Sequence, residues 1–237
     1  MLLDININYL ANLRNSIGGG EPDILKFARY CEYSGADGIV AHISDGNSGL
    51  SNYDIKNIRQ HLRTRFILKI PMTSQAQQLA LDCKPDIVYL VPETSEASPS
   101  NGFNVLKHQS EVNDFMVSLM YEGIMTGVFI EPDFDQVNSA YKAGMHYVEI
   151  NTRKFVEAFK FGDFEREFTA IKEAAILANT LGLKVSLCKG IDYQNVSKLT
   201  EIHGISEMTI GHSITAKAIY NGLDSSIKEM KELINEK

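Results

Sequence analysis

Short apolar runs alternate along the chain with longer segments of helical period. A run of about four to eight residues with few polar positions, bounded by turn residues, is typical of a buried β-strand. Eight such runs predict strands at Leu2–Asn8, Gly38–His42, Phe66–Ile70, Asp86–Val91, Thr126–Ile130, Tyr147–Asn151, Lys184–Lys189 and Glu207–Gly211.

Amphipathic stretches between these runs predict helices. The stretch Ser51–Leu62 carries its own start signal, because Ser51 can cap the first turn and Asp54 follows three residues later, as in a capping box. The other stretches are Asp23–Ser34, Ser74–Cys83, Val105–Glu122, Phe134–Ala143, Asp163–Leu181, Tyr193–Thr200 and Ser213–Asn221. A charged segment, Asp224–Lys237, predicts one more helix.

Glycines mark the helix ends. Gly35, Gly123, Gly144 and Gly182 each stand where a predicted helix stops before the next strand, and glycine adopts the left-handed stop at low cost. Eight β-to-α units without a Gly-x-Gly-x-x-Gly fingerprint favour a closed barrel over an open doubly wound sheet. The predicted fold is one α/β domain over residues 1–237, a (β/α)8 TIM barrel with an additional C-terminal helix.

Composition narrows the possible partners. The 237 residues include 23 basic and 30 acidic ones, a net charge of -7 that disfavours nucleic-acid binding. Three cysteines without paired spacing, and no leader pattern at the N-terminus, predict a cytoplasmic protein. No apolar run approaches the roughly 18 residues of a membrane span, so no membrane role is expected.

Two predicted strands carry a lysine near the carboxyl end, Lys69 and Lys189. Burying an unpaired ammonium costs several kcal/mol, so each side chain is expected to meet a ligand or a counter-charge. In barrels the chemistry lies at the carboxyl ends of the strands. The residues predicted there are Asn6, Asn8, His42, Lys69, Glu93, Glu131, Glu149, Asn151, Lys189, Gly211 and His212.

Each of these candidates also has a structural interpretation. The lysines can pair with Glu93, Glu131 or Glu149, or extend their charged ends to solvent. His42 is either a general acid/base or a hydrogen-bonded core residue.

The segment Gly211-His212-Ser213 opens a predicted helix after the eighth strand. Backbone N–H groups and the helix dipole there can hold a phosphate, although a glycine before a helix is also ordinary turn geometry. Two further segments are candidate lids: Gly18–Gly20, and the aromatic and basic stretch 153–164. The first is equally a flexible spacer, and the second an oligomer contact. No Cys-x-x-Cys or His-Glu-x-x-His spacing indicates a metal.

Several motifs together resemble the pyridoxine 5′-phosphate synthase family. They are Asn6-Ile7-Asn8 with Leu13-Arg14-Asn15, Ser34-Gly35-Ala36-Asp37-Gly38-Ile39 with His42, Leu90-Val91-Pro92-Glu93, Val148-Glu149-Ile150, Leu181-Gly182-Leu183-Lys184-Val185 and Ile210-Gly211-His212. The resemblance implies a barrel enzyme of vitamin B6 synthesis that condenses an aminoketone phosphate with deoxyxylulose phosphate without a cofactor. It also implies a homo-oligomer, typically an octamer.

The chain departs from the family pattern at catalytic positions. The resemblance implies a glutamate base where Lys69 stands and a histidine acid where Lys189 stands. Other departures are Asn8, Tyr9, Ile17, Ser44 and Gly49, where the family has acidic, histidine or arginine residues. The resemblance assigns Gly190, Gly211 and His212 to product or phosphate binding, and these are retained.

These residues lead to one main hypothesis. The chain is expected to be a transferase- or lyase-type enzyme acting on a small phosphorylated carbonyl or amino-carbonyl compound, without cofactor or metal. Lys189 is the predicted nucleophile or acid/base, Lys69 its electrostatic partner and His42 a proton shuttle. Asn6, Asn8, Glu149, Gly190, Gly211 and His212 are the predicted binding residues. The alternatives are pyridoxine 5′-phosphate synthesis by a rearranged acid/base set and a non-catalytic metabolite-binding protein.

Overall fold

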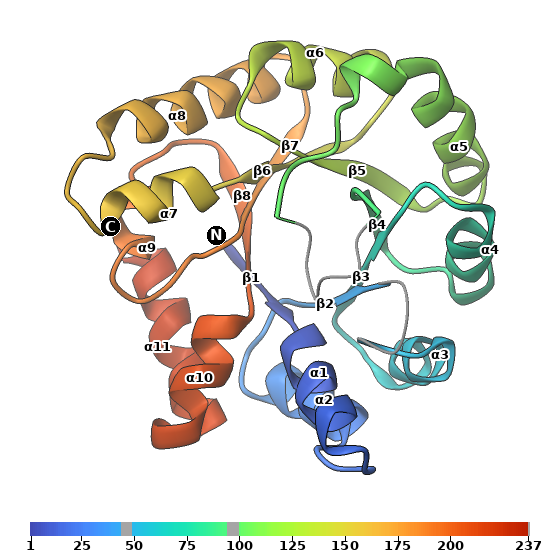
Figure 1. The fold of residues 1–237 in the computed structure, drawn as a ribbon, viewed down its shortest axis with the longest axis vertical. Helices are drawn as coiled ribbons and strands as arrows, with labels where there is room; N and C mark the ends of the chain where they lie inside the picture. Colours follow the sequence, from blue (N-terminus) through green and yellow to red (C-terminus); the bar gives the residue numbers. More distant parts are fainter. Residues whose placement is uncertain (44–48, 94–99, 237) are drawn as a thin grey trace.

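Eight parallel strands close into a barrel in the computed structural model, which describes residues 1–43, 49–93 and 100–236 (Figure 1). Each strand pairs with the next along the chain, and the eighth pairs with the first. The strands are β1 (Leu2–Asn6), β2 (Gly38–His42), β3 (Arg65–Ile70), β4 (Ile87–Leu90), β5 (Met125–Ile130), β6 (Tyr147–Asn151), β7 (Lys184–Cys188) and β8 (Ile205–Ile210). The predicted TIM barrel is confirmed.

Helices surround the barrel, as Figure 1 shows. They are α1 (Asn8–Ile17), α2 (Ile24–Tyr33), α3 (Asn52–His61), α4 (Ser74–Cys83), η1 (Leu106–His108), α5 (Gln109–Tyr121), α6 (Phe134–Lys142), α7 (Arg153–Phe159), α8 (Glu165–Thr180), α9 (Val196–Thr200), α10 (His212–Asn221) and α11 (Leu223–Asn235). The additional C-terminal helix is α11, and its predicted last residue, Lys237, lies outside the described part of the chain.

The expected end signals are in place. Ser51 and Asp54 form the predicted capping box at the start of α3. The four glycines predicted to stop helices all have positive φ, between 77° and 102°. Local chemistry therefore sets these helix boundaries as the sequence indicates.

Two helices were not expected. The prediction of strand through Asn8 is wrong, because the strand ends at Asn6 and Asn8 begins α1. The candidate lid at 153–164 contains α7, and Gly18–Gly20 follows α1 instead of a strand. The N-cap residues of these helices, Ile7 and Thr152, accept no side-chain hydrogen bond from the first turn, so the usual sequence signal is missing.

The strand residues alternate between two environments. One set packs outward on the helices in the main core, and the other points into the barrel, where Val40, Ile67, Tyr89 and Tyr147 form a smaller apolar cluster. Gly127 is required in this layer, because a Cβ there would lie 2.6 Å from the Tyr89 ring and 2.8 Å from Cβ of Tyr147.

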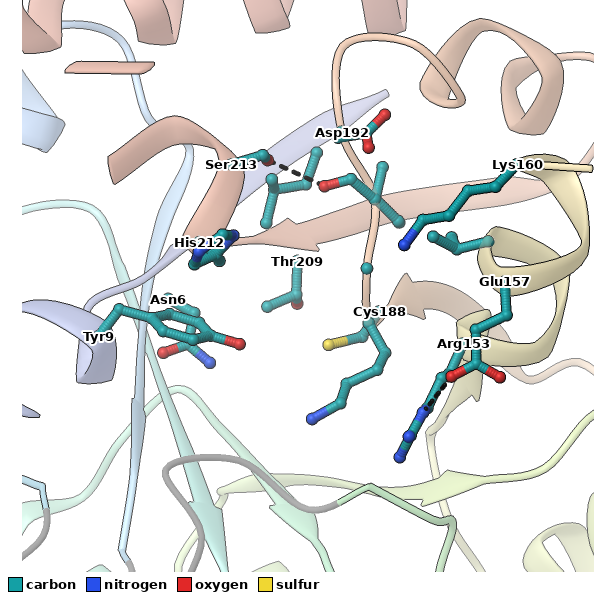
Figure 2. A pocket seen from close by; sticks show the side chains of 16 residues that line it. Asn6, Tyr9, Arg153, Glu157, Lys160, Cys188, Asp192, Thr209, His212 and Ser213 are labelled. Carbon is teal, nitrogen blue, oxygen red and sulfur yellow. Dashed lines mark hydrogen bonds and ion pairs between the residues drawn. The ribbon is translucent and has the colours of Figure 1, made fainter. Parts of the chain in front are cut away.

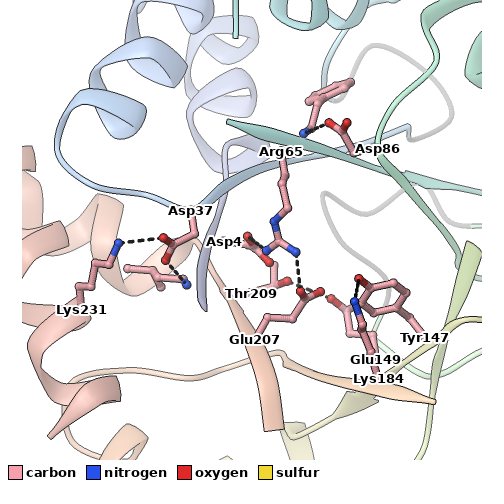
Figure 3. A network of polar contacts seen from close by, with 12 residues as sticks. Asp4, Asp37, Arg65, Asp86, Tyr147, Glu149, Lys184, Glu207, Thr209 and Lys231 are labelled. Atoms are coloured by element: carbon pink, nitrogen blue, oxygen red, sulfur yellow. Dashed lines mark hydrogen bonds and ion pairs between the residues drawn. The ribbon is translucent and has the colours of Figure 1, made fainter. Parts of the chain in front are cut away.

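Charged side chains fill the barrel at the amino-terminal side of this layer (Figure 3). The Arg65 guanidinium donates to Asp4 and to Glu207, at 2.8 Å each, and both carboxylates are buried. The Tyr89 hydroxyl also donates to Glu207, at 3.0 Å. One guanidinium thus serves two carboxylates, so burial and the neighbouring Glu207 outweigh Arg65 and raise the pKa of Asp4 from 3.8 to about 8.

This shift predicts a pH-dependent stability. The unfolded chain releases the Asp4 proton above about pH 4, whereas the folded chain keeps it until about pH 8, so rising pH favours unfolding across that window. Asp4→Asn removes the group. The free energy of unfolding of the variant, relative to wild type, should rise between pH 5 and 8 by up to about 1.4 kcal/mol per pH unit.

Urea unfolding at several pH values measures this difference. If the free energy of unfolding changes with pH in the same way for wild type and variant between pH 5 and 8, the assignment of the bound proton to Asp4 is contradicted.

Candidate active site

A cavity of about 410 Å³ opens at the carboxyl ends of β1, β7 and β8. It lies between α7 and the start of α10, and Figure 2 shows its polar side chains converging from these elements. The lining residues are Asn6, Tyr9, Arg153, Val156, Glu157, Lys160, Cys188, Lys189, Gly190, Ile191, Asp192, Thr209, Ile210, Gly211, His212 and Ser213. Five predicted site residues are among them: Asn6, Lys189, Gly190, Gly211 and His212.

The turn after β7 has an unusual backbone. Lys189 and Gly190 have φ of 94° and 78°, so two consecutive residues are left-handed. A Cβ on Gly190 would lie 3.1 Å from Val156 of α7. This close packing brings the turn and α7 together as two walls of the cavity.

The turn after β8 is also closely packed. A Cβ on Gly211 would lie 2.7 Å from the backbone oxygen of Asn6 and 3.0 Å from the Tyr9 ring, so only glycine fits without a shift. Gly211 precedes the first residue of α10, His212, whose ring meets Tyr9 edge-on at 5.5 Å. The backbone N–H groups that begin α10 therefore lie at the cavity.

Lys69 and Glu149 form a buried ion pair inside the barrel mouth. Lys69 Nζ lies 2.7 and 2.6 Å from the two oxygens of Glu149, and the side chains are 3% and 0% exposed. The Thr209 hydroxyl donates to the same carboxylate at 3.0 Å, and Lys69 reaches Cys188 Sγ at 3.4 Å. Cys188 and Thr209 line the cavity, so the pair lies directly beneath it.

The pairing keeps Lys69 protonated. Burial alone would lower its pKa, but the Cys188 sulfur, once ionised at high pH, and the Glu149 carboxylate outweigh burial, and the pKa of Lys69 is raised. Burial first, and then Glu149, raises the pKa of Cys188 to about 11, so its thiol is neutral near pH 7 and Glu149 supplies the counter-charge. Pairing with Glu149 is one of the alternatives that the sequence left open for Lys69.

The remaining two predicted site residues, Asn8 and His42, lie outside the cavity lining. The Asn8 amide donates to the His42 carbonyl and accepts from the His42 backbone N–H, both at 2.7 Å, so it joins α1 to β2. His42 is buried beside Lys69 on the neighbouring strand. Neither lines the cavity. Ser44, one of the departures from the family pattern, lies outside the described residues.

Several cavity residues had no specific signal in the sequence. Tyr9 lies beside the predicted strand end, and burial, followed by Cys188, raises its pKa while Lys69 opposes the shift. Arg153 and Lys160 come from the stretch expected to be a lid or an oligomer contact. Arg153 forms a 2.7 Å ion pair with Glu157 on the same helix.

Aromatic packing fixes α7 in place. Phe155 packs against Phe159, Phe164 and Phe168, with ring centroids 5.6 to 6.1 Å apart. These phenylalanines hold α7 on α8 within this chain, and Phe161 is exposed. The helix packs on α8 through these rings and forms one wall of the cavity.

Within the described ranges, no helix is long and apolar enough to cross a membrane. The same residues contain no cluster of three or more histidine, cysteine, aspartate or glutamate side chains suited to holding a metal ion.

Sequence comparison gives matches along nearly the whole chain. The family described as "Pyridoxal phosphate biosynthesis protein PdxJ" matches residues 3–236. Pyridoxine 5′-phosphate synthase of Geobacter sp. (strain M21) is 39% identical over 233 residues, covering 98% of both chains. The synthase of Chlorobium phaeobacteroides is 36% identical over 235 residues, covering 99% of this chain and all of the relative.

Solved structures of low identity share the fold. The 3-keto-L-gulonate-6-phosphate decarboxylase of Vibrio cholerae superposes with a TM-score of 0.68 at 12% identity, covering 99% of this chain and 97% of the other. Thiamine phosphate pyrophosphorylase of Pyrococcus furiosus gives 0.65 at 14% identity, covering 98% and 94%. These likenesses support the barrel architecture alone.

The buried ion pair predicts that substitutions of Lys69 and Glu149 have strongly non-additive effects on the free energy of unfolding. Lys69→Met leaves the Glu149 carboxylate buried without its cation, which should lower the free energy of unfolding by about 3–5 kcal/mol. In Lys69→Met/Glu149→Gln neither position carries a charge, and the oxygen of the new amide can still accept from Thr209. The double variant should therefore recover about 2 kcal/mol or more of that loss.

Urea unfolding of the two single variants and the double variant measures this coupling. Lys56→Met is the matched control, because it breaks a surface pair with Asp82 of similar length, 2.9 Å, and should have a much smaller effect. Additive losses in the double variant would contradict the pairing.

Proposed function

Because this chain belongs to the PdxJ family of pyridoxal phosphate biosynthesis proteins, we propose that it is an enzyme acting on a small phosphorylated carbonyl or amino-carbonyl compound. The observation that carries the proposal is the cavity between the turns at Lys189-Gly190 and Gly211-His212, which combines backbone N–H groups with an amine. The compound would bind there, above the Lys69–Glu149 pair.

Phosphate recognition is supported by the start of α10. Helix N-termini favour anions through free N–H groups and the helix dipole, and Gly211 permits close approach of a ligand to the backbone. Arg153, Lys160 and Lys189 add basic groups to the wall. The relatives' name, pyridoxine 5′-phosphate synthase, also specifies a phosphate ester as the product.

Lys189 is the proposed nucleophile. A neutral lysine amine can attack a carbonyl carbon, and loss of water then gives an imine that stabilises negative charge on the adjacent carbon. The ammonium of Lys69 has no lone pair and its charge is matched by Glu149, so it is assigned an electrostatic role. Tyr9, at the cavity wall, and His42, beside Lys69, are the proposed proton carriers.

The position of Lys69 argues against the acid/base set that the resemblance implies. A protonated lysine has three donors and no acceptor, so it cannot act as the carboxylate base. Pyridoxine 5′-phosphate synthesis by this chain would need another base.

Reductive trapping tests the nucleophile. Dihydroxyacetone phosphate, a small phosphorylated ketone, should form an imine that sodium borohydride converts to a stable secondary amine on Lys189, identified by peptide mass spectrometry. Lys189→Met should abolish this adduct. Lys160→Met is the matched control from the same cavity and should retain it.

Two results would contradict the lysine mechanism. One is the absence of any adduct at Lys189 across a panel of phosphorylated aldehydes and ketones. The other is formation of pyridoxine 5′-phosphate from the two family substrates by Lys189→Met at the wild-type rate.

We also propose that the protein is a homo-oligomer. Exposed apolar side chains gather on the neighbouring helices α1 and α10: Leu13, Ile17, Ile219 and Tyr220. Covering such side chains is typical of a subunit interface. Sedimentation should give a mass several times 26.4 kDa, and a monomer at micromolar concentration would contradict the proposal.

A further inference from the structure

We infer that Thr152 is a positioning residue for Lys189: its hydroxyl holds the lysine backbone in the left-handed conformation that presents the side chain to the cavity. The catalytic meaning of this contact rests on the proposed function, whereas the contact and its effect on the backbone do not. Thr152 is fully buried between β6 and α7 and does not line the cavity.

The backbone of Lys189 is unusual for its place in the fold. In the described part of the chain, two residues other than glycine have positive φ, Lys84 and Lys189. Lys84 ends helix α4 in the left-handed position that helices commonly use. Lys189 follows a strand directly, so no helix end explains its φ of 94°. A conformation of this kind persists only where neighbouring groups fix it.

Thr152 supplies that restraint from both sides of the lysine. Its hydroxyl lies 2.6 Å from the Lys189 carbonyl oxygen and 3.1 Å from that of Cys188. Its backbone N–H also donates to the Cys188 carbonyl, at 2.9 Å. The two carbonyls belong to the peptide planes before and after the lysine Cα, so holding both fixes its φ and ψ together.

The Thr152 hydroxyl does not cap helix α7, although Thr152 occupies the N-cap position. Thr152 is the residue before the first turn of α7, where threonine ordinarily accepts a hydrogen bond from the helix backbone, and no such bond is present. The Asn151 side chain instead accepts from the backbone N–H of Arg153, at 3.0 Å. The Thr152 hydroxyl is therefore directed across to the end of β7.

The consequence is a fixed starting point for the lysine side chain. Without the hydroxyl, the peptide after Lys189 can rotate toward the negative φ that non-glycine residues prefer, and this rotation moves the Cα–Cβ bond. Displacement of a reacting group by about 1 Å can cost as much as a hundredfold in rate. Thr152 thus affects the reaction through Lys189 and needs no contact with the substrate.

The test compares two variants. Thr152→Val keeps the branched shape of the side chain and loses the hydroxyl, whereas Thr152→Ser keeps the hydroxyl. The readout is the rate of reductive trapping of dihydroxyacetone phosphate on Lys189 as a function of its concentration. Thr152→Val should lower the maximal rate at least about tenfold, and Thr152→Ser should stay within about threefold of wild type. The concentration for half-maximal trapping should change less than the rate.

Thr180→Val is the matched control. It removes a hydroxyl-to-carbonyl bond of 2.8 Å, to Ile176 within α8, at a position outside the cavity lining, and should leave trapping unchanged. Wild-type maximal trapping by folded Thr152→Val would overturn the positioning role.

Crystal structures of the same variants give an answer that does not depend on trapping. Lys189 should leave the left-handed region in Thr152→Val and stay in it in Thr152→Ser. If wild type forms no adduct but the backbone changes as expected, the proposed function fails and the restraint stands. If φ of Lys189 stays positive in Thr152→Val, the inference is overturned.

Discussion

The charges inside the barrel have to balance where solvent does not reach them. Asp4, Glu149 and Glu207 are three buried carboxylates, and the cations that contact them are Arg65 and Lys69. One carboxylate is therefore left without a full counter-charge, and the raised pKa of Asp4 identifies it as the group that keeps a proton. These five groups, all in the described part of the chain, sum to zero charge only with that proton counted.

The ion pairs of Arg65 and of Lys69 lie at two different levels of the barrel. Arg65 joins β3 to β1 and β8 on the amino-terminal side of the apolar cluster that contains Tyr89 and Tyr147. Lys69 joins β3 to β6 beneath the cavity. The Lys69–Glu149 pair places polar groups directly beneath the cavity. The groups proposed to react lie at the rim, where Lys189, Tyr9 and the turn at Gly211 line the cavity.

Much of the fold follows from the sequence because its signals are local. Apolar runs located all eight strands to within about two residues of their ends, and glycines such as Gly182 marked the helix stops. The two unexpected helices lack such signals. Asn8 continues an apolar strand without a capping residue, and α7 is short and rich in phenylalanine, which is equally typical of a loop or a contact surface.

The site was predictable only in part. Strand-end position predicts that Lys189, Gly211 and Asn6 lie at one rim, since every strand of a parallel barrel ends there, and all three line the same cavity. The partner of Lys69 was not determined, because Glu149 is 80 residues away and three glutamates were equivalent in sequence. The conformation of Lys189 and its contact with Thr152 depend on packing between β7 and α7, which no local pattern encodes.

Gly127 shows how an uncharged position controls this electrostatic arrangement. Its missing side chain makes room for the Tyr89 ring, and the hydroxyl of that ring reaches Glu207. A methyl group at this point would push the phenol away and leave a carboxylate oxygen with one donor fewer. The acidity of the barrel interior is thus set in part by a residue with nothing to ionise, and steric bulk there would act as an electrostatic perturbation.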